Sequence, residues 1–595
     1  MVQFLTYIYL IFVLVFRTVF PFSAPVKNVT VPDTGSLTAT DALGRQAVTA
    51  GESEKKVGIF YFLWLGEHGT SGPYNNTEFV EAHPDAIESS EKWMEYGGGG
   101  YGAFHHWGEP LFGYYLSSDK WVISRHCQML TDAGVDFMVF DTTNGYPYLE
   151  RVLDLIDVWY GYYEQGWDVP QLAFYTNAGS GNVMNLLYDR LYNNEELKNT
   201  YPKLDELWFR MNGKPMIVGN ADDENLRPEV NEYFRVKEVQ WPTDQKHSDG
   251  FPWMEFGTTL NTIGAYYKNS FKDESIMNVS VAQHCDTCRF SASAWYGGND
   301  HGRSWHDGKK DTGEGAVLHG YNFAEQWEYA IKLDPDIIFV TGFNEWAAQR
   351  LQFVDNEPIG FCDNCDTEYS RDLEPSAGIL GDNYYMQMVD YIAKFKGTRD
   401  VLPRGEETVI DVNGDFSQWD GVNAVYKDYR GDTADRDSAG FGSLRYTDDS
   451  GRNDIVLAKV AEDKDNLYFY AETDGDLTSP ADTGWMTLFI NVNGNEGYDF
   501  CINRTSPENG EASVEKINGD ERTALGNAAI RYEGSRLMLR VEKSLLGFAP
   551  GADATLSFKW ADNYTDGDVY SFYTRGEAAP FGRMNWVYSG IYAKK

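Results

Sequence analysis

Six short apolar runs, rich in β-branched and aromatic residues, recur along the first part of the chain, and most of them end in a polar side chain. Each run is too short for a buried helix and is typical of a strand buried in a parallel sheet. Stretches with helical spacing separate the runs, and in the clearest, Leu149–Tyr160, the apolar residues form one stripe. The runs are Val57–Trp64, Phe137–Asp141, Leu172–Asn177, Pro215–Asn220, Met277–His284 and Ile337–Trp346.

The alternation of strand and helix implies parallel strands joined by right-handed crossovers. With a weaker run near Trp253–Phe256, it predicts an eight-stranded (β/α)8 barrel of the TIM type over residues 55–397. Beyond this range the pattern changes to short alternating runs separated by turn residues, which predicts a linker over 398–410 and an antiparallel β-sandwich over 411–595. The predicted fold class is therefore α/β, a barrel followed by an all-β domain.

The amino terminus carries an apolar run, Leu5–Phe16, and a small-residue pair, Ser23-Ala24. The length of the run suits a secretory signal better than a membrane span, which needs about 20 residues. No Lys or Arg precedes the run, and Pro25 directly follows the small residues, so an uncleaved anchor stays an alternative. We expect residues 1–24 to be a signal peptide or anchor, residues 25–54 to be a polar linker, and the protein to be secreted.

The chain has 90 acidic and 50 basic residues, which gives a formal net charge of −40. Nucleic acids and anionic membranes would be repelled by this charge, so neither is expected as a partner. Aromatic residues make up 15% of the chain, a surplus that suits stacking on carbohydrate, although all-β domains also use many aromatics. We expect a monomer that acts outside the cell on a neutral or cationic target.

Two pairs of cysteines with CxxC spacing follow predicted strands and are expected on one face of the barrel. Four thiolates there would suit a structural Zn²⁺. In a secreted protein the same thiols would form disulfides, and the gap between the pairs is longer than in a zinc ribbon. Zinc, disulfides and free thiols therefore all stay open. The four residues are Cys285, Cys288, Cys362 and Cys365.

A carboxylate follows the last of the six strands, in the segment Asn344-Glu345-Trp346. Barrel enzymes keep their chemistry at the carboxyl ends of the strands, so Glu345 is the leading candidate for a reacting carboxylate. Trp346 offers a flat apolar face to a sugar ring. The alternative is that Glu345 forms an ion pair at the strand end and that Trp346 belongs to the core.

Five segments within residues 55–397 carry a resemblance to a known family. They read FYFLW, AGVDFMVFDTTN, GRSWH, NFAEQWEYAIKLDPDIIFVTGFNEW and SRDLEPSAGILGDNYYMQMVDYIAKFKG. This part of the chain resembles the glycoside hydrolase family 71/99-like proteins, which are similar to the endo-acting α-mannosidases of family 99. The resemblance implies a (β/α)8 barrel, and it matches Glu345 to the glutamate that assists the substrate 2-hydroxyl in attacking the anomeric carbon. The tail from Asp411 resembles, more weakly, the carbohydrate-binding sandwiches of the family 9 and DOMON-like type.

The chain departs from this family where a proton donor is needed. The family-99 motif continues Asn-Glu-Trp-His-Glu, with its second glutamate as the general acid, whereas this chain has Ala347 and Ala348. A glycosidase needs two carboxyl groups at the scissile bond. We therefore predict Glu345 and Asp141 as the catalytic carboxyl pair, the alternative for Asp141 being a cap of the following helix. The next candidates for the acid are Glu67 and Glu255.

Polar and aromatic side chains near other strand ends are expected to line the mouth of the barrel. Amides and imidazoles recognise sugar hydroxyls, and an arginine offers a forked donor. The alternative for each of these side chains is a structural role, such as a hydrogen bond within its own loop. The predicted substrate-binding residues are Glu67, Asn144, Asn177, Asn220, Glu255, His284, Arg303, Asn344 and Trp346.

The tail is expected to hold the enzyme on its polymer through exposed tryptophans, or alternatively to serve as a structural cap on the barrel. Its loop Asp411–Asp415 resembles a calcium loop, but Phe416 and Val422 replace the Gly and Glu that an EF-hand requires. Calcium in another sandwich loop stays open, and no cofactor is required by the predicted chemistry. The candidate tryptophans are Trp419, Trp485, Trp560 and Trp586.

These features predict a secreted glycoside hydrolase that cleaves a polysaccharide or glycan chain by carboxylate catalysis. The competing hypothesis is a non-catalytic glycan-binding protein whose barrel lost its acid at Ala348. A polysaccharide lyase is a third alternative.

Overall fold

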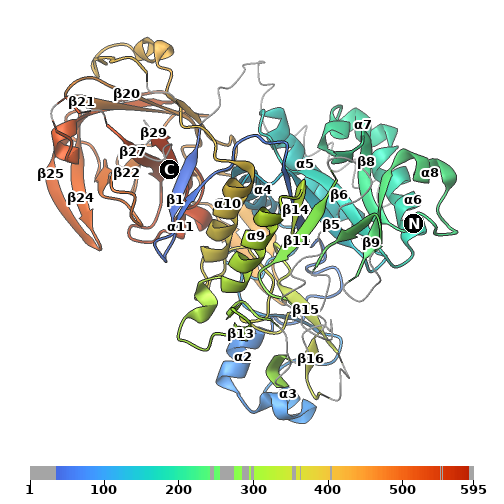
Figure 1. The fold of residues 1–595 in the computed structure, drawn as a ribbon. Coiled ribbons are helices and arrows are strands. Elements are labelled where there is room, and N and C mark those ends of the chain that lie inside the picture. Colours follow the sequence, from blue (N-terminus) through green and yellow to red (C-terminus); the bar gives the residue numbers. More distant parts are fainter. Residues whose placement is uncertain are drawn as a thin grey trace.

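The computed structural model describes residues 35–241, 247–254, 274–283, 294–296, 301–351, 357–361, 364–402, 405–549, 551–552 and 554–588. A barrel and a β-sandwich lie side by side, the sandwich coloured orange and red in Figure 1. Among the described residues, none of the helices has the length and apolarity needed to cross a membrane. The run Leu5–Phe16 lies outside these ranges.

The barrel sheet confirms the predicted (β/α)8 class. Its strands follow the order β10-β9-β8-β6-β5-β3-β14-β11, and every neighbouring pair in this order is parallel. The sheet is therefore a nearly closed barrel, with β10 and β11 at its two ends. The strands are β3 (Lys56–Tyr61), β5 (Phe137–Thr142), β6 (Gln171–Thr176), β8 (Lys214–Gly219), β9 (Arg235–Gln240), β10 (Gly250–Pro252), β11 (Ile276–Ser280) and β14 (Ile337–Thr341).

Helices lie on the outside of the barrel, and all those named below connect its strands except the last, which follows β14 (Figure 1). The predicted stripe on Leu149–Tyr160 is confirmed in α5, where Val152, Ile156 and Trp159 are buried. The helices are α4 (Lys120–Asp132), α5 (Leu149–Glu164), α6 (Ser180–Leu187), α7 (Glu195–Thr200), α8 (Pro228–Tyr233), α9 (Tyr321–Leu333) and α10 (Asn383–Lys396).

The strand β9 is missing from the predicted strands, because its charged residues obscure the alternation of apolar and polar side chains that marks a strand. Lys237 of this strand is fully buried, and its Nζ lies 2.5 Å from Asp249 Oδ1 and 3.4 Å from Glu274 Oε2. Arg235 Nη2 lies 2.5 Å from the same glutamate oxygen. These charges compensate one another at the amino-terminal ends of β9, β10 and β11, so the strand buries residues that normally mark a loop.

An additional layer covers part of the carboxyl end of the barrel. It contains α2 (Asn76–Ala82), α3 (Ser90–Glu95) and a small sheet of β4 (Phe104–His106), β15 (Ala347–Leu351) and β16 (Gly360–Phe361). Because β4 follows β3 in the chain and β15 follows β14, this layer extends from two adjacent barrel strands. Figure 1 shows α2, α3 and β16 below the barrel.

The carboxy-terminal domain is antiparallel, as predicted, but its large sheet also includes the amino-terminal residues. The strands β1 (Leu37–Thr40) and β2 (Gln46–Val48) extend this sheet beside β29 (Asn585–Tyr588). The prediction that residues 25–54 are a linker is therefore wrong for the part described. The other strands of this sheet are β17 (Val425–Lys427), β20 (Ile455–Glu462), β21 (Asn466–Thr473), β22 (Thr487–Asn491), β23 (Phe500–Ile502), β24 (Glu511–Asn518), β25 (Glu521–Glu533), β26 (Arg536–Glu542), β27 (Leu556–Asp562) and β28 (Glu577–Ala579).

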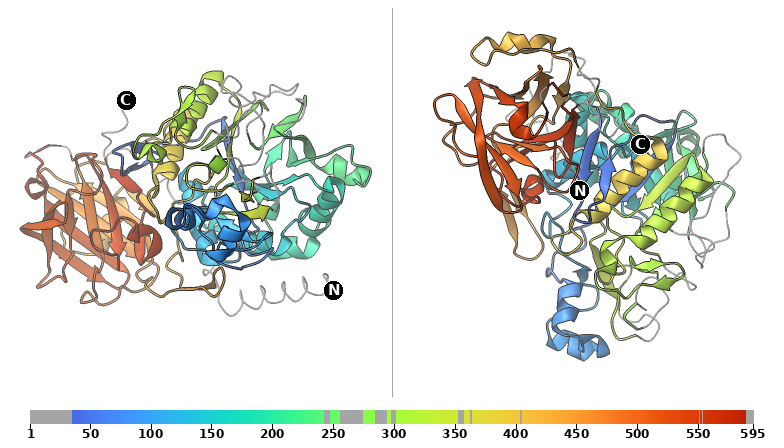
Figure 2. Two further views of the ribbon diagram at one scale, coloured as in Figure 1. Left: turned by 90° about the horizontal axis from the view of Figure 1, so that it is seen from below. Right: turned by 60° about the vertical axis from the view of Figure 1, so that its left-hand side comes forward.

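The sandwich packs closely against the barrel, and Figure 2 shows the two bodies in contact in both further views. Two buried ion pairs cross the interface: Arg436 Nη2 lies 2.8 Å from Asp119 Oδ2, and Arg583 Nε lies 2.7 Å from Asp382 Oδ2. Trp167 stacks on Tyr429 with ring centroids 3.8 Å apart. This interface favours the structural cap over a freely tethered domain.

The four tryptophans proposed as stacking platforms of the tail are all buried. A buried indole cannot present its face to a polymer, so this role is wrong for each of them. They fill the apolar core that a sandwich of this size needs. The residues are Trp419, Trp485, Trp560 and Trp586.

Candidate active site at the barrel mouth

The segment after β14 is held from both sides. Asn344 Oδ1 accepts from the Phe62 amide at 2.9 Å, and its Nδ2 donates to the Phe62 carbonyl at 3.1 Å. Trp346 is completely buried, stacks on Trp107 with centroids 4.6 Å apart, and donates to Glu374 Oε2 at 2.5 Å. Asn344 and Trp346 therefore hold the loop, and their predicted contacts with a sugar are replaced by this structural role.

Glu345 lies between these two anchors at the carboxyl end of β14. Only 3% of its surface is exposed, and its carbonyl accepts from Asn364 Nδ2 at 2.5 Å. The predicted position at the end of a barrel strand is correct. Its neighbours fix the backbone on both sides of this residue.

A buried polar network contacts the loop that follows β14. Glu374 Oε2 accepts from Tyr115 at 2.7 Å, and Glu374 Oε1 lies 3.1 Å from His126 Nε2. Burial, together with the nearby charge of Glu374, raises the pKa of Asp372 to about 8. Both carboxylates belong to the segment SRDLEP, so the resemblance already pointed to this stretch, although no single residue in it was predicted.

Arg303 belongs to the same network instead of the mouth. It is fully buried, and its Nη2 donates to the Asp372 carbonyl at 2.8 Å and to Ser370 Oγ at 2.9 Å. Its guanidinium lies 4.3 Å from the ring centroid of Tyr384. The predicted contact with substrate is wrong, because every side of this group is occupied by protein.

The two alanines that replace the His-Glu of the resembling family lie in β15. Ala348 pairs with His105 of β4 and packs in an apolar cluster with Trp93, Ile359 and Phe361. Burial lowers the pKa of His105 to about 3, so this neighbour is neutral as well. The position of Ala348 is therefore an apolar site.

Four neighbouring strands, β3, β5, β6 and β8, carry polar side chains just beyond their carboxyl ends. The amides predicted there are exposed at Asn144, Asn177 and Asn220. Asn144 Nδ2 donates to the Tyr148 hydroxyl at 2.6 Å, and Asn220 Oδ1 accepts from the Asp222 amide at 3.0 Å. Because these strands are adjacent in the sheet, the residues form one open arc around the mouth.

Aromatic rings line the same part of the mouth. Trp64 lies 5.2 Å from Phe104 between ring centroids, and His68 stacks on Phe104 at 5.8 Å. Tyr146, 53% exposed, meets His68 at 6.1 Å. None of these residues is among the predicted site residues. The sequence signal that indicates them is an aromatic residue shortly after a polar residue at a strand end, as Tyr146 follows Asn144.

Two carboxylates of the arc have different surroundings. Asp141 Oδ1 accepts from the Thr143 amide at 3.0 Å and from its hydroxyl at 2.8 Å, and both bonds stabilise the ionised form. Burial raises the pKa of Glu67, although Arg151, whose Nε lies 3.5 Å from Glu67 Oε1, acts in the opposite direction. Glu67 therefore holds a proton to a higher pH than an ordinary glutamate, whereas the bonds to Asp141 favour a charged group.

Several predicted residues lie outside the described part of the chain, so their predicted roles stay predictions. Cys365 is described and buried in the apolar cluster around Trp93. Zinc and disulfides at the CxxC pairs therefore stay untested. The residues outside are Glu255, His284, Cys285, Cys288 and Cys362.

Comparison with known proteins gives no match to a family model or to a curated protein sequence. Among solved structures, the chain is similar to the GH99 endo-α-mannosidase from Bacteroides thetaiotaomicron, with 12% identity and a TM-score of 0.35 over 58% of this chain and 98% of that one. The complex of the enzyme with bis-Tris propane gives 14% identity and a TM-score of 0.32 over 57% of this chain and 96% of that one.

Proposed function

We propose that this chain is a glycoside hydrolase that cleaves an O-glycosidic bond of a polysaccharide or glycan at the barrel mouth. The observation that carries the proposal is the arc beyond β3, β5, β6 and β8, in which exposed amides and aromatic rings lie beside two carboxylates with different surroundings: the pKa of Glu67 is raised by burial, and Asp141 accepts two hydrogen bonds from Thr143. Sugars present hydroxyls at their edges and apolar C–H faces, and amides beside aromatic rings match both.

The proposed chemistry divides between carboxyl groups with different environments. Glu67, whose pKa is raised, donates its proton to the leaving oxygen as the glycosidic bond breaks. Asp141, whose carboxylate accepts two hydrogen bonds from Thr143, stabilises the positive charge that develops on the sugar ring. Glu345 acts as the base and removes the proton of the substrate 2-hydroxyl, whose oxygen bonds to the anomeric carbon as the leaving oxygen departs. Water then opens the three-membered ring so formed and completes the hydrolysis. Glu67 thus replaces Asp141 in the donor role, because a group stabilised as an anion is a poor proton donor.

Secretion is part of the proposal. It is supported by the apolar run Leu5–Phe16 and by the net charge of −40, which suits a protein working on a neutral glycan.

The test is reducing-sugar release from a panel of glycans, wild type against Glu345→Gln. We expect release by the wild type and a loss of at least about 100-fold in the variant, the usual size of a general-base contribution. The matched control is Glu195→Gln, on the exposed first turn of α7, which should keep wild-type activity. Equal rates in Glu345→Gln and wild type would contradict the proposal.

A second candidate is a non-catalytic glycan-binding protein. It is favoured by the apolar surroundings of Ala348 and by the small exposure of Glu345. Calorimetry separates the two: a wild type that binds a glycan of the panel and releases no sugar from it supports the binding protein. Weakened binding in Tyr146→Ala would then place the glycan on the arc.

A further inference from the structure

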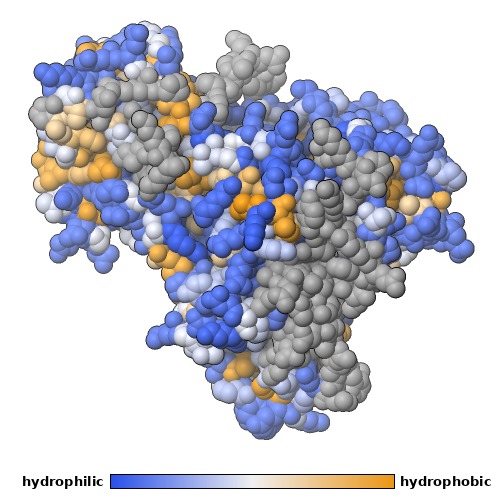
Figure 3. All heavy atoms as spheres, in the orientation of Figure 1, coloured by the Kyte–Doolittle hydropathy of each residue, from blue (hydrophilic) through white to orange (hydrophobic). Residues whose placement is uncertain are grey.

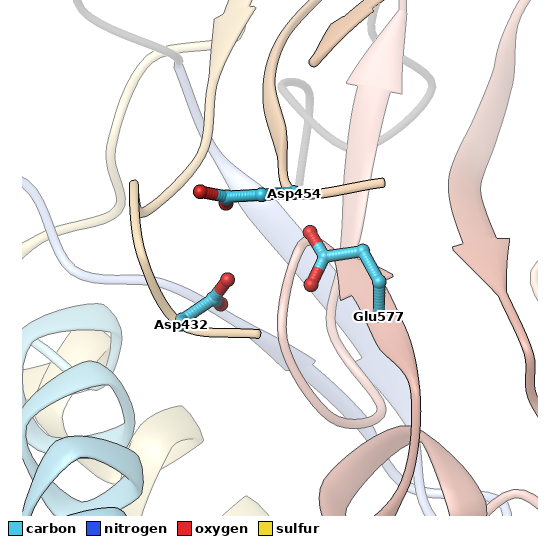
Figure 4. A group of neighbouring side chains, drawn as sticks. All are labelled: Asp432, Asp454 and Glu577. Atoms are coloured by element: carbon cyan, nitrogen blue, oxygen red, sulfur yellow. The ribbon is translucent and has the colours of Figure 1, made fainter. Parts of the chain in front are cut away.

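Three carboxylates from separate segments of the sandwich converge beside the barrel. Asp432 lies in the loop after β17, Asp454 directly precedes β20, and Glu577 begins β28. Figure 4 shows their carboxyl groups directed toward one another. One oxygen of each lies within 4.8 Å of the others, a separation that two ligands of the same Ca²⁺ can have, since each Ca–O distance is about 2.3–2.6 Å.

The cluster is buried and incompletely hydrogen-bonded. Asp432 and Glu577 are each 3% exposed, and so is Asp428, a fourth carboxylate whose charge interacts with that of Glu577. Within the described part of the chain, Asp428 Oδ2, Asp432 Oδ1 and Asp454 Oδ1 are buried without a hydrogen-bond partner. Buried carboxylate oxygens normally have donors, so these three call for a ligand.

The other carboxylate oxygens are fixed by amide donors. Asp454 Oδ2 accepts from the Gly431 amide at 2.7 Å, and Glu577 Oε1 accepts from the Ile455 amide at 3.1 Å. Asp432 Oδ2 accepts from Gln128 Nε2 of α4 at 3.2 Å. Each carboxylate is therefore held through one oxygen, which leaves the second oxygen for a shared ligand.

The nearby cations Arg125, Arg430 and Lys559 offset the negative charge of the cluster only in part. Arg125 Nη1 of α4 donates to the Asp432 carbonyl oxygen at 2.6 Å, and Arg430 pairs with Asp474. Lys559 of β27 is buried and donates to the Pro580 carbonyl, and burial lowers its pKa to about 7. Asp132, facing from α4, adds another acidic group, whose pKa burial raises to about 7. Either protons or a bound cation must compensate the cluster.

We propose that Asp432, Asp454 and Glu577, with Asp428 beside them, bind a hard divalent cation, calcium. The available donors are all carboxylate oxygens, which is the ligand set of calcium and magnesium and not that of zinc or copper. Calcium is favoured because it accepts several carboxylates without strict octahedral geometry. The ion would join the loop after β17, the start of β20 and the start of β28 on the side of the sandwich that contacts α4.

The experiment uses the full chain. Elemental mass spectrometry of the protein purified in calcium should find about one calcium per chain. Treatment with EGTA should lower the Tm by at least about 3 °C, and CaCl₂, but not MgCl₂, should restore it, because a ligand bound only to the folded state stabilises that state. Absence of calcium together with a Tm that EGTA and CaCl₂ leave unchanged would overturn the proposal, and shared protons would then explain the cluster. Restoration by MgCl₂ alone would overturn the assignment to calcium.

Substitutions of the proposed ligands test where the calcium ion binds. The double variant Asp432→Asn, Glu577→Gln should lose the calcium response, and it should fold, because it removes charge from a crowded cluster at nearly constant shape. The matched control is Asp411→Asn, Asp415→Asn, in the loop that resembles a calcium loop, and it should respond like the wild type. A calcium response that persists in the first variant would overturn the site. If the double variant fails to fold, the single variant Asp454→Asn serves the same comparison, since Asp454 is the least buried of the three.

Discussion

Glu67 and Asp141 are equivalent acids in water apart from one methylene group, and the fold makes them different. Two hydrogen bonds from Thr143 favour the anion of Asp141, whereas burial raises the pKa of Glu67. The same reasoning applies to Asp372 in the buried polar network, because burial raises the pKa of its carboxyl group to about 8. At the scale of the residue, the surroundings of a carboxylate decide what it can do.

Replacing the proposed donor should depend on the leaving group. Glu67→Gln should lose at least about 100-fold in kcat/KM on substrates with alkoxide leaving groups and much less on aryl glycosides, whose leaving groups need little protonation. Initial rates on a matched pair of substrates measure this, with Glu195→Gln as the control. An equal loss on both substrates would remove Glu67 from the donor role.

Asp372 should make the protein less stable as the pH rises. Its folded pKa of about 8 is above the value of about 4 expected in the unfolded chain, so the folded state keeps a proton that the unfolded state releases. Stability contributed by this proton is fully present below about pH 4 and is lost as the pH rises through about 8, up to about 5 kcal/mol at ~1.4 kcal/mol per pKa unit. Urea unfolding from pH 5 to 9 should show a shallower decline for Asp372→Asn. The exposed control Asp222→Asn should follow the wild type, and parallel curves for all three proteins would contradict the assignment.

At the scale of the element, Gly58 of β3 leaves the space that an aromatic ring of the barrel core occupies. Gly58 has no side chain, and the ring of Phe137 from the neighbouring strand fills the space; a Cβ at Gly58 would lie 2.2 Å from that ring. Phe137 in turn stacks on Phe209 with centroids 3.8 Å apart. The barrel interior is therefore packed by rings that depend on this glycine.

Gly58→Ala should destabilise the barrel by about 1–3 kcal/mol or more, the cost of overpacking a well-filled core. The matched control is Gly161→Ala within α5, where a Cβ meets no atom within 4 Å. That change should stabilise the protein by about 0.5–1 kcal/mol, because alanine favours the helix more than glycine does. Denaturant unfolding measures both, and a neutral Gly58→Ala would show that the ring moves aside freely.

At the scale of the whole molecule, the sandwich and the barrel depend on each other. The amino-terminal strands β1 and β2 extend the sandwich before the chain enters the barrel, and the Asp119–Arg436 and Asp382–Arg583 ion pairs cross the interface. Loss of one partner from such a buried pair typically destabilises a protein by about 3–5 kcal/mol.

A chain that ends at Gly397 should therefore aggregate, because it exposes Asp119, Asp382 and the apolar surface around them. Size-exclusion chromatography measures this. The matched control is the full chain with a protease site introduced at the exposed Glu406-Glu407. The protease cuts this chain after it has folded, so the sandwich stays present. The two pieces should elute together. A monomeric, active truncated chain would instead support an independent tether.

The sequence by itself determined the fold class and the position of Glu345. Apolar runs ending in polar residues indicate buried parallel strands, because the length of the run and the polar residue that ends it are visible within a few consecutive residues. It also placed Asp141, Asn144, Asn177 and Asn220 at strand ends, because a strand end is visible where the apolar run stops.

Only the tertiary structure decided which of these side chains are accessible. Trp346 and Arg303 have the composition of a sugar site, yet Trp107, Tyr384 and Asp372 surround them from distant parts of the chain. The short strands β1 and β2 resemble a tether in composition, and they become strands because β29 offers its edge. Burial and partners come from residues far apart in sequence, so the protonation of Glu67 and the convergence of Asp432, Asp454 and Glu577 exist only in the folded chain.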